Sequence, residues 1–255
     1  MKRLIILYTL LLIQSSGFSG SPVSVSDPVK ILFIGSSYFN FNNLPALLQN
    51  LVSQSPYEVE VDSYMQNGLF LADHASSPIT EEKIKSRSWD YVILQGAGSL
   101  MAYPDSLTHH PVRPAISTLR ELILQNSPDT RIVFCMPWAF EDGMTWKEGW
   151  SDSYDDMQEK IDSVTLYYAD EFNLLVAPVG RAWHQVLKEK GYPLHYLHQS
   201  DWNHPTVKGS YLTACVLFST LFHRSTEGNS FRSGLSKKEA RYLQHLASLI
   251  VKSYP

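Results

Sequence analysis

The chain has 255 residues, of which 21 are basic and 25 are acidic, and its formal net charge is −4 with the histidines neutral. This acidic balance argues against nucleic acid as a partner, because binding a polyanion relies on an excess of Lys and Arg. Cys135 and Cys215 are the only cysteines. Both belong to apolar runs and are expected to be buried, so a disulfide between them is allowed but not required. The oligomeric state is left open.

The first twenty residues have the pattern of a secretory signal peptide. Two basic residues precede an apolar run over residues 4–13, and small residues follow it. The apolar run has about ten residues, roughly half of what spans a bilayer. We therefore expect a signal peptide over residues 1–20, a linker over residues 21–28, and a secreted or periplasmic product that is not inserted stably in a membrane.

Residues 29–255 are expected to form one domain in which strands alternate with helices. Continuous apolar runs predict strands that are covered on both faces, whereas the alternating run over residues 58–62 predicts an edge strand. The predicted strands span residues 30–34, 58–62, 89–94, 131–136 and 173–177. The predicted helices span residues 44–52, 114–125, 153–171, 179–190, 207–223 and 236–252. This order predicts an α/β fold, a parallel five-stranded sheet with helices on both faces and a ligand site beyond the carboxyl ends of the strands.

Two polar stretches carry candidate chemistry. Ser37 follows the first strand, where its hydroxyl would face the ligand crevice. Asp201 and His204 are three residues apart in a polar loop, a spacing at which the carboxylate can hold the imidazole in one tautomer. Each stretch alone is more often a turn or a helix cap. Together they favour a triad of a serine nucleophile, a histidine base and an aspartate that orients the histidine.

The order of these stretches resembles that of the SGNH/GDSL hydrolase superfamily. The matching stretches are Gly35-Ser36-Ser37-Tyr38 after the first strand, Gly68 after the second, Gly96 after the third and Asp201-x-x-His204-Pro205 before the C-terminal helices.

The resemblance implies a flavodoxin-like, three-layer α/β/α sandwich that hydrolyses esters through an acyl-enzyme and needs no metal or other cofactor. It also implies roles for individual residues. Ser37 would be the nucleophile, His204 the base and Asp201 its orienter. The backbone N–H groups of Ser37 and Gly68 would bind the oxyanion.

One position departs from the superfamily pattern and indicates a divergent branch. The third block ordinarily supplies an asparagine as a further oxyanion donor, and Gly98 stands at that position. Losing one such donor typically lowers the rate about a hundred- to a thousandfold. The Gln95 amide is a candidate replacement, and Asn67 is a weaker one. The alternative for Gln95, held equal to the first, is a hydrogen bond that ties neighbouring loops together.

Four residues are candidates for contacting substrate: His74, His109, Trp138 and Trp202. Three of them have a plainer interpretation as well. His74 would otherwise lie on a helix surface and His109 in solvent, and Trp138 would pack its own loop down.

Histidine and aspartate recur every three residues at His195, His198, Asp201 and His204, which raises the question of a metal site. Prolines at 193 and 205 argue against a continuous helix through these residues, so no metal site is expected.

The predicted function is that of a secreted serine ester hydrolase that removes acetyl or other short acyl groups from carbohydrate. The expected partner is therefore a small-molecule or glycan ester. A lipid-type acyl esterase is the alternative substrate class. A glycan-binding protein that keeps the fold but has lost turnover is the alternative function, because the third-block asparagine is missing.

Overall fold

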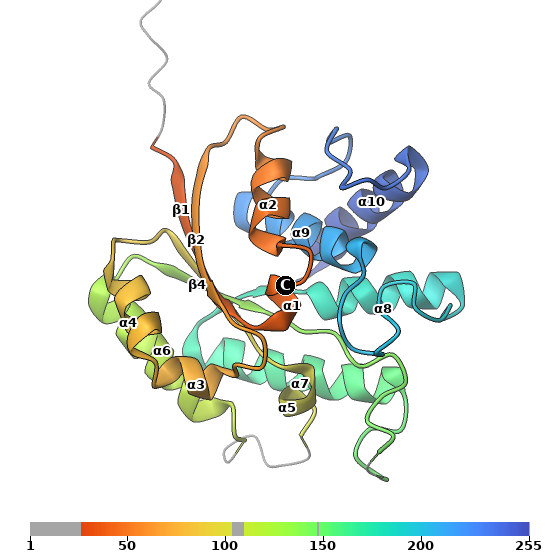
Figure 1. The fold of residues 1–255 in the computed structure, drawn as a ribbon, viewed down its shortest axis with the longest axis horizontal. Coiled ribbons are helices and arrows are strands. Elements are labelled where there is room, and N and C mark those ends of the chain that lie inside the picture. Colours follow the sequence, from red (N-terminus) through yellow and green to blue (C-terminus); the bar gives the residue numbers. More distant parts are fainter. Residues whose placement is uncertain (1–26, 104–109, 147, 255) are drawn as a thin grey trace, which may run out of the picture.

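The computed structural model describes residues 27–103, 110–146 and 148–254 (Figure 1). The predicted signal peptide, most of the predicted linker and His109 lie outside these ranges. The strands are β1 (Val29–Gly35), β2 (Val59–Met65), β3 (Tyr91–Gln95), β4 (Arg131–Cys135) and β5 (Leu175–Ala177). The helices are α1 (Ser37–Asn40), α2 (Leu44–Val52), α3 (Leu71–Ala75), α4 (Pro78–Lys85), α5 (Gly98–Met101), α6 (Arg113–Asn126), α7 (Tyr154–Phe172), α8 (Val179–Lys190), α9 (Val207–Phe222) and α10 (Lys237–Ser253).

All five strands are parallel, in the order β2-β1-β3-β4-β5. This is the flavodoxin-like order, and it confirms the predicted fold class. The apolar runs of β1 and β3 lie inside the sheet, whereas the alternating sequence of β2 places it at an edge. In such a sheet the strand order reverses between β1 and β3, so the loops that follow these two strands flank a crevice.

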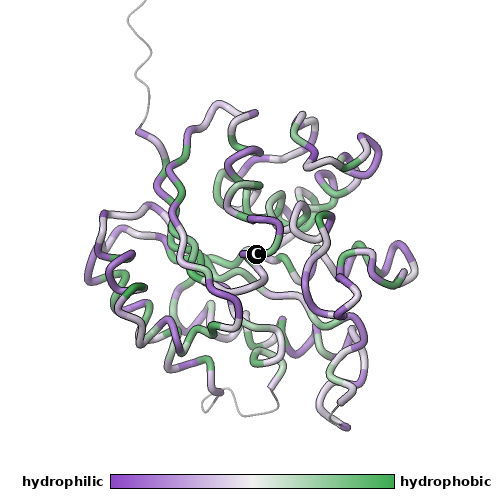
Figure 2. Tube along the Cα trace, viewed as in Figure 1, coloured by the Kyte–Doolittle hydropathy of each residue, from purple (hydrophilic) through white to green (hydrophobic). Residues whose placement is uncertain are grey.

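Helices cover both faces of the sheet, as the alternation of elements predicts. Helices α2, α8, α9 and α10 pack together on one face, and α3, α4, α6 and α7 lie on the other (Figure 1). Figure 2 shows the apolar residues concentrated in the strands and the polar residues on the outer helices. Among the described residues, no helix is long and apolar enough to cross a bilayer.

Helix α9 is the central helix of its layer, and almost all of its residues are buried between the sheet and its neighbouring helices. Gly209 permits this packing. A Cβ atom there would lie 2.5 Å from the Trp183 ring and 2.6 Å from the Leu197 carbonyl oxygen. Cys215 in α9 and Cys135 in β4 are both buried and free, so they do not form a disulfide.

Candidate active site

Ser37 lies where β1 ends and is the first residue of the short helix α1. The turn into this helix is tight because Gly35 has no side chain. A Cβ atom at Gly35 would lie 2.7 Å from the Phe39 ring. The turn therefore holds the serine at the carboxyl edge of the sheet, as its position in the sequence predicts.

Ser37, His204 and Asp201 lie together although the serine and the histidine are 167 positions apart in the chain. His204 Nε2 is 2.9 Å from Ser37 Oγ, and His204 Nδ1 is 2.7 Å from Asp201 Oδ2. The carboxylate therefore accepts the Nδ1 proton, which leaves Nε2 free to accept the proton of the serine hydroxyl. This is the geometry of a nucleophile, a general base and an orienting acid.

Asp201 also organises the backbone beside His204. Its Oδ1 accepts hydrogen bonds from the backbone N–H groups of Asn203, at 3.1 Å, and His204, at 2.9 Å. Partial burial raises the pKa of the Asp201 carboxyl, but the hydrogen bonds from His204 and Asn203 outweigh this effect and lower it. The carboxylate is therefore ionised at neutral pH, as an acceptor for the imidazole must be.

Residues 198–205, which we call the His204 loop, are closed at their base and fixed from the side. His198 and Pro205 form an isolated antiparallel bridge, and the backbone N–H of Gln199 donates to the His204 carbonyl oxygen at 2.7 Å. Trp202 has a φ of 66°, an uncommon conformation for a non-glycine residue. Its carbonyl oxygen accepts from the backbone N–H of Glu141 at 2.8 Å, which anchors the strained part of the loop.

Two residues that the sequence analysis did not single out hold the histidine in place. The Phe41 ring stacks on the His204 imidazole with 4.3 Å between centroids. The Asn42 amide donates to the Pro205 carbonyl oxygen at 3.1 Å and to the Ser210 hydroxyl at 2.9 Å. The segment that follows the serine therefore also clamps the His204 loop.

Two backbone N–H groups are available to bind an oxyanion. Those of Ser37 and Gly68 have no acceptor within the described ranges. Gly68 has a φ of 84°, which favours glycine, and it follows β2. The amide of Asn40 donates to Asn67 Oδ1 at 2.8 Å, so the Gly68 loop is tied to the helix that begins at the nucleophile.

Gln95 does not serve as the predicted oxyanion donor. Its Oε1 accepts from the backbone N–H of Ser36 at 2.9 Å, and its Nε2 donates to the Gly96 carbonyl oxygen at 2.6 Å. The side chain is buried and ties the loop after β3 to the loop after β1. The alternative interpretation, a hydrogen bond between loops, is the one that this geometry supports.

Two of the predicted substrate contacts are wrong because the side chains are buried. His74 is bonded through both ring nitrogens, to the Thr80 hydroxyl and to the Gly35 carbonyl oxygen, each at 3.0 Å. Trp138 stacks on both Tyr38 and Trp183. Both residues pack against the segment that carries the nucleophile, His74 through Gly35 and Trp138 through Tyr38. His109 lies outside the described residues.

Trp202 is the one tested candidate that reaches solvent. Its side chain is exposed, and its ring meets the His195 ring edge-on at 5.2 Å. It belongs to the same loop as the base His204.

The histidines that repeat every three residues do not converge on a common point. His195 pairs with Glu141 through Nδ1 at 2.7 Å, and His198 is buried and donates from Nε2 to the Ala139 carbonyl oxygen. In the part of the chain that the structure describes, no group of His, Cys, Asp and Glu side chains is arranged to hold a metal ion.

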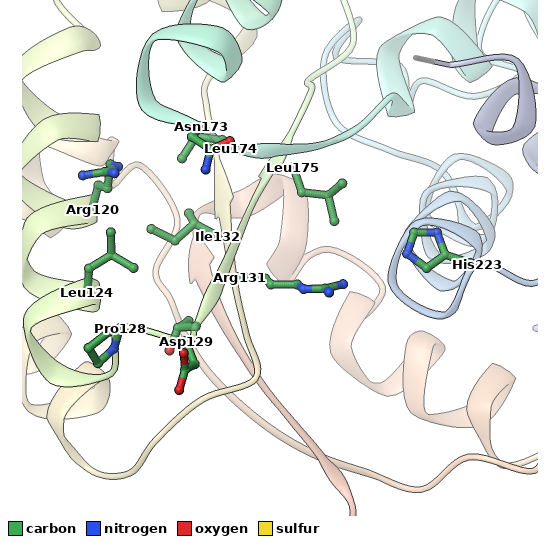
Figure 3. A pocket seen from close by; sticks show the side chains of 11 residues that line it. Arg120, Leu124, Pro128, Asp129, Arg131, Ile132, Asn173, Leu174, Leu175 and His223 are labelled. Carbon is green, nitrogen blue, oxygen red and sulfur yellow. The ribbon is translucent and has the colours of Figure 1, made fainter.

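A hollow of about 660 Å³ lies at the opposite end of the sheet from the triad. Figure 3 shows its lining side chains, which come from α6, from β4 and β5 with the loops that precede these strands, and from His223 at the end of α9. Arg120 is already bonded to the Phe172 carbonyl oxygen. This hollow is remote from the chemistry of the triad, which we take as the functional site.

Comparison with known proteins supports the fold. No family model and no curated protein matches the sequence. Among solved structures, a DUF4886 family protein from Bacteroides uniformis is 19% identical, with a TM-score of 0.75 over 89% of this chain and 96% of that one. A candidate SGNH hydrolase from Slackia heliotrinireducens is 23% identical, with a TM-score of 0.62 over 76% of this chain and 100% of that one. An acetylxylan esterase from Geobacillus stearothermophilus is 18% identical, with a TM-score of 0.53 over 84% of this chain and 100% of that one. The chain therefore has the fold of the SGNH hydrolases, as the sequence resemblance implies.

Proposed function

We propose that the protein is a serine ester hydrolase that removes acetyl or other short acyl groups from carbohydrate after export from the cell. The observation that carries the proposal is the position of His204, which bridges Ser37 Oγ and Asp201 Oδ2 at 2.9 and 2.7 Å. This arrangement activates a serine hydroxyl for acyl transfer.

The reaction has two halves. His204 Nε2 takes the hydroxyl proton of Ser37 as Oγ attacks the ester carbonyl carbon, and the oxyanion is bound by the backbone N–H groups of Ser37 and Gly68. When the ester C–O bond breaks, the imidazolium gives its proton to the leaving alcohol. His204 then takes a proton from water, which attacks the acyl-enzyme and releases the acid. Asp201 stays ionised and stabilises the imidazolium in both halves.

Carbohydrate is the substrate class that the surface favours. Four aromatic side chains are exposed on the loops that follow β2, β3 and β4 and on the His204 loop: Phe70, Tyr103, Trp146 and Trp202. Flat apolar rings in solvent suit the apolar faces of sugar rings, and aromatic residues are large contributors to binding surfaces. The likeness in fold to an acetylxylan esterase points in the same direction.

The first test is hydrolysis of p-nitrophenyl acetate and of acetylated xylan by the mature chain and by Ser37→Ala. Removal of the nucleophile should lower kcat by at least about a thousandfold while the thermal unfolding temperature stays close to that of the wild type. A wild type that hydrolyses neither ester, with an intact fold, would contradict the proposal.

The same assays distinguish the alternatives. A lipid-type esterase would prefer p-nitrophenyl esters of long acyl chains to the acetyl ester. A glycan-binding protein without turnover would not hydrolyse acetylated xylan, and its wild-type and Ser37→Ala forms would bind this glycan with equal affinity.

A further inference from the structure

The space beside Gly98 explains why the third oxyanion donor cannot come from that position. A Cβ atom at Gly98 would lie 2.7 Å from the Trp138 carbonyl oxygen and 3.5 Å from the Tyr38 hydroxyl. Contacts below 3.0 Å with backbone atoms essentially do not occur, so no asparagine fits there without movement of the backbone. The Tyr38 hydroxyl therefore lies next to the position that an asparagine side chain would leave from.

Tyr38 directly follows the nucleophile and points inward. Its ring stacks on Trp138 with 4.4 Å between centroids, and its hydroxyl donates to Asn203 Oδ1. Burial, assisted by the negative charge of Asp201, raises the pKa of the Tyr38 phenol far above its ordinary value. The hydroxyl therefore keeps its proton and can donate it to Asn203 Oδ1, and in this arrangement Nδ2 points away from Tyr38.

Asn203 is held at three points. Its backbone N–H donates to Asp201 Oδ1 at 3.1 Å, its carbonyl oxygen accepts from Trp138 Nε1 at 2.9 Å, and its Oδ1 accepts from Tyr38. Its Nδ2 has no acceptor within the described ranges. A half-buried amide N–H₂ without a partner, on the residue that precedes the base, is therefore fixed in place and unused in the free protein.

We propose that Asn203 Nδ2 supplies the third oxyanion donor and that Tyr38 is its positioning residue. The inference rests on the proposed ester hydrolysis. Asn203 directly precedes the base, and its side chain is hydrogen-bonded to Tyr38, which directly follows the nucleophile. A donor that is oriented before substrate arrives needs no reorganisation when charge develops on the carbonyl oxygen, which is the condition for a large effect on rate.

The test compares Asn203→Ala and Asn203→Asp with the wild type on p-nitrophenyl acetate. Both variants lack the N–H donor, and both should lower kcat about ten- to a thousandfold with little change in KM. Tyr38→Phe should lower kcat less, because the amide remains but loses its orientation. The double variant Tyr38→Phe/Asn203→Ala should be no slower than Asn203→Ala, since an orienter has no effect without the group that it orients.

The affinity for a trifluoromethyl ketone is a second measurement, and it would not change if Asn203 had only a structural role. The serine adds to this ketone and forms an oxyanion, so its affinity should fall across the variants in parallel with kcat/KM. Asn126→Ala is the matched control. It removes an amide that lies at the end of α6, far from the His204 loop, and donates to the carbonyl oxygens of Ile84 and Arg87, each at 2.9 Å. This variant should keep kcat and ketone affinity within a few-fold of the wild type.

The outcomes separate the two proposals. An active wild type with Asn203→Ala of unchanged kcat and ketone affinity would overturn the role of Asn203 and leave ester hydrolysis standing. A loss in Asn126→Ala equal to that in Asn203→Ala would also overturn it, because a general disturbance of the fold would then explain both. A wild type that neither hydrolyses esters nor binds the ketone would overturn both proposals.

Discussion

Replacing His198 with glutamine is expected to remove most of the loss of unfolding free energy that the protein undergoes on acidification through protonation of this buried histidine. His198 is buried at the base of the His204 loop, and its Nδ1 has no hydrogen-bond partner among the described residues. Burial lowers the pKa of His198 from 6.5 to about 4, and this effect outweighs the hydrogen bond to Ala139 and the charge of Asp201, which favour the cation. The ring is therefore neutral in the folded protein at pH 7.

The groups around the ring do not reverse this conclusion. The nearest carboxylate oxygen, Oε1 of Glu141, is 3.9 Å from His198 Nδ1, which is too far for a hydrogen bond. Glu141 is already bonded to the ring and the backbone N–H of His195. The rings of Tyr154 and Trp183 pack edge-on against His198. They do not accept a hydrogen bond from a protonated imidazole as water would.

The sign and size of the effect follow from linkage. Because the pKa is lowered in the folded state, the stabilisation is complete above pH 6.5 and is lost as the pH falls through about 4. The pKa falls by about 2.5, and each pKa unit is worth about 1.4 kcal/mol, so the full effect is about 3.5 kcal/mol. Roughly 2.5 kcal/mol of it is lost between about pH 7.5 and pH 4.5.

The measurement is urea unfolding, followed by tryptophan fluorescence, at these two pH values. Glutamine keeps a donor for the Ala139 carbonyl oxygen but does not titrate. The difference in unfolding free energy between wild type and His198→Gln should therefore shift by roughly 2.5 kcal/mol in favour of the variant at the lower pH. Leu197→Ala, a buried neighbour without a titrating group, should lose a constant amount. If the difference in unfolding free energy between wild type and His198→Gln were the same at both pH values, the reasoning would be refuted.

Two further predictions concern packing and substrate. Gly209→Ala should lower the unfolding free energy by about 1–3 kcal/mol, because its Cβ would lie 2.5 Å from the Trp183 ring. If urea unfolding gave equal stability for the variant and the wild type, α9 would be able to shift away from Trp183. Trp202→Ala should raise KM for acetylated xylan oligosaccharides several-fold and leave p-nitrophenyl acetate hydrolysis nearly unchanged. Equal losses on both substrates would instead assign Trp202 to loop geometry.

Long periodic elements were predictable from the sequence because their pattern reports burial directly. The apolar runs of β1, β3 and β4 and the alternating run of β2 led to the correct sheet and to the correct edge strand. The helices α1, α3, α4 and α5 were missed. Each has four to eight residues, too few to display a helical period.

The position of Ser37 was predictable because β1 ends at the carboxyl edge of the parallel sheet. Asp201 and His204 lie in the loop before α9, and their spacing of three residues, not strand order, indicated that they act together. The environment of these residues was not predictable. Trp138 and His74 have polar groups that bond inside the protein, and one sequence does not show which polar group will find a partner. The same limit applies to Gln95, for which both interpretations were open until its hydrogen bonds to Ser36 and Gly96 were seen.

Asn203 and Phe41 lay beside the predicted residues but carried no signal of their own. An asparagine before a histidine is also a common turn residue, and a phenylalanine after a short helix is also a common core residue. Only the three-dimensional contacts with Tyr38 and with the His204 ring distinguish their roles.

The central claim is that His204 and Asp201 activate Ser37 as a nucleophile, and covalent labelling tests it most directly. A fluorophosphonate probe should modify the wild-type chain at one site, and peptide mass spectrometry should place the adduct on Ser37. Ser37→Ala should not be labelled, and His204→Ala should react at least about a hundredfold more slowly, because a serine without its base is weakly nucleophilic. Labelling at another residue, or equal rates in wild type and His204→Ala, would contradict the account.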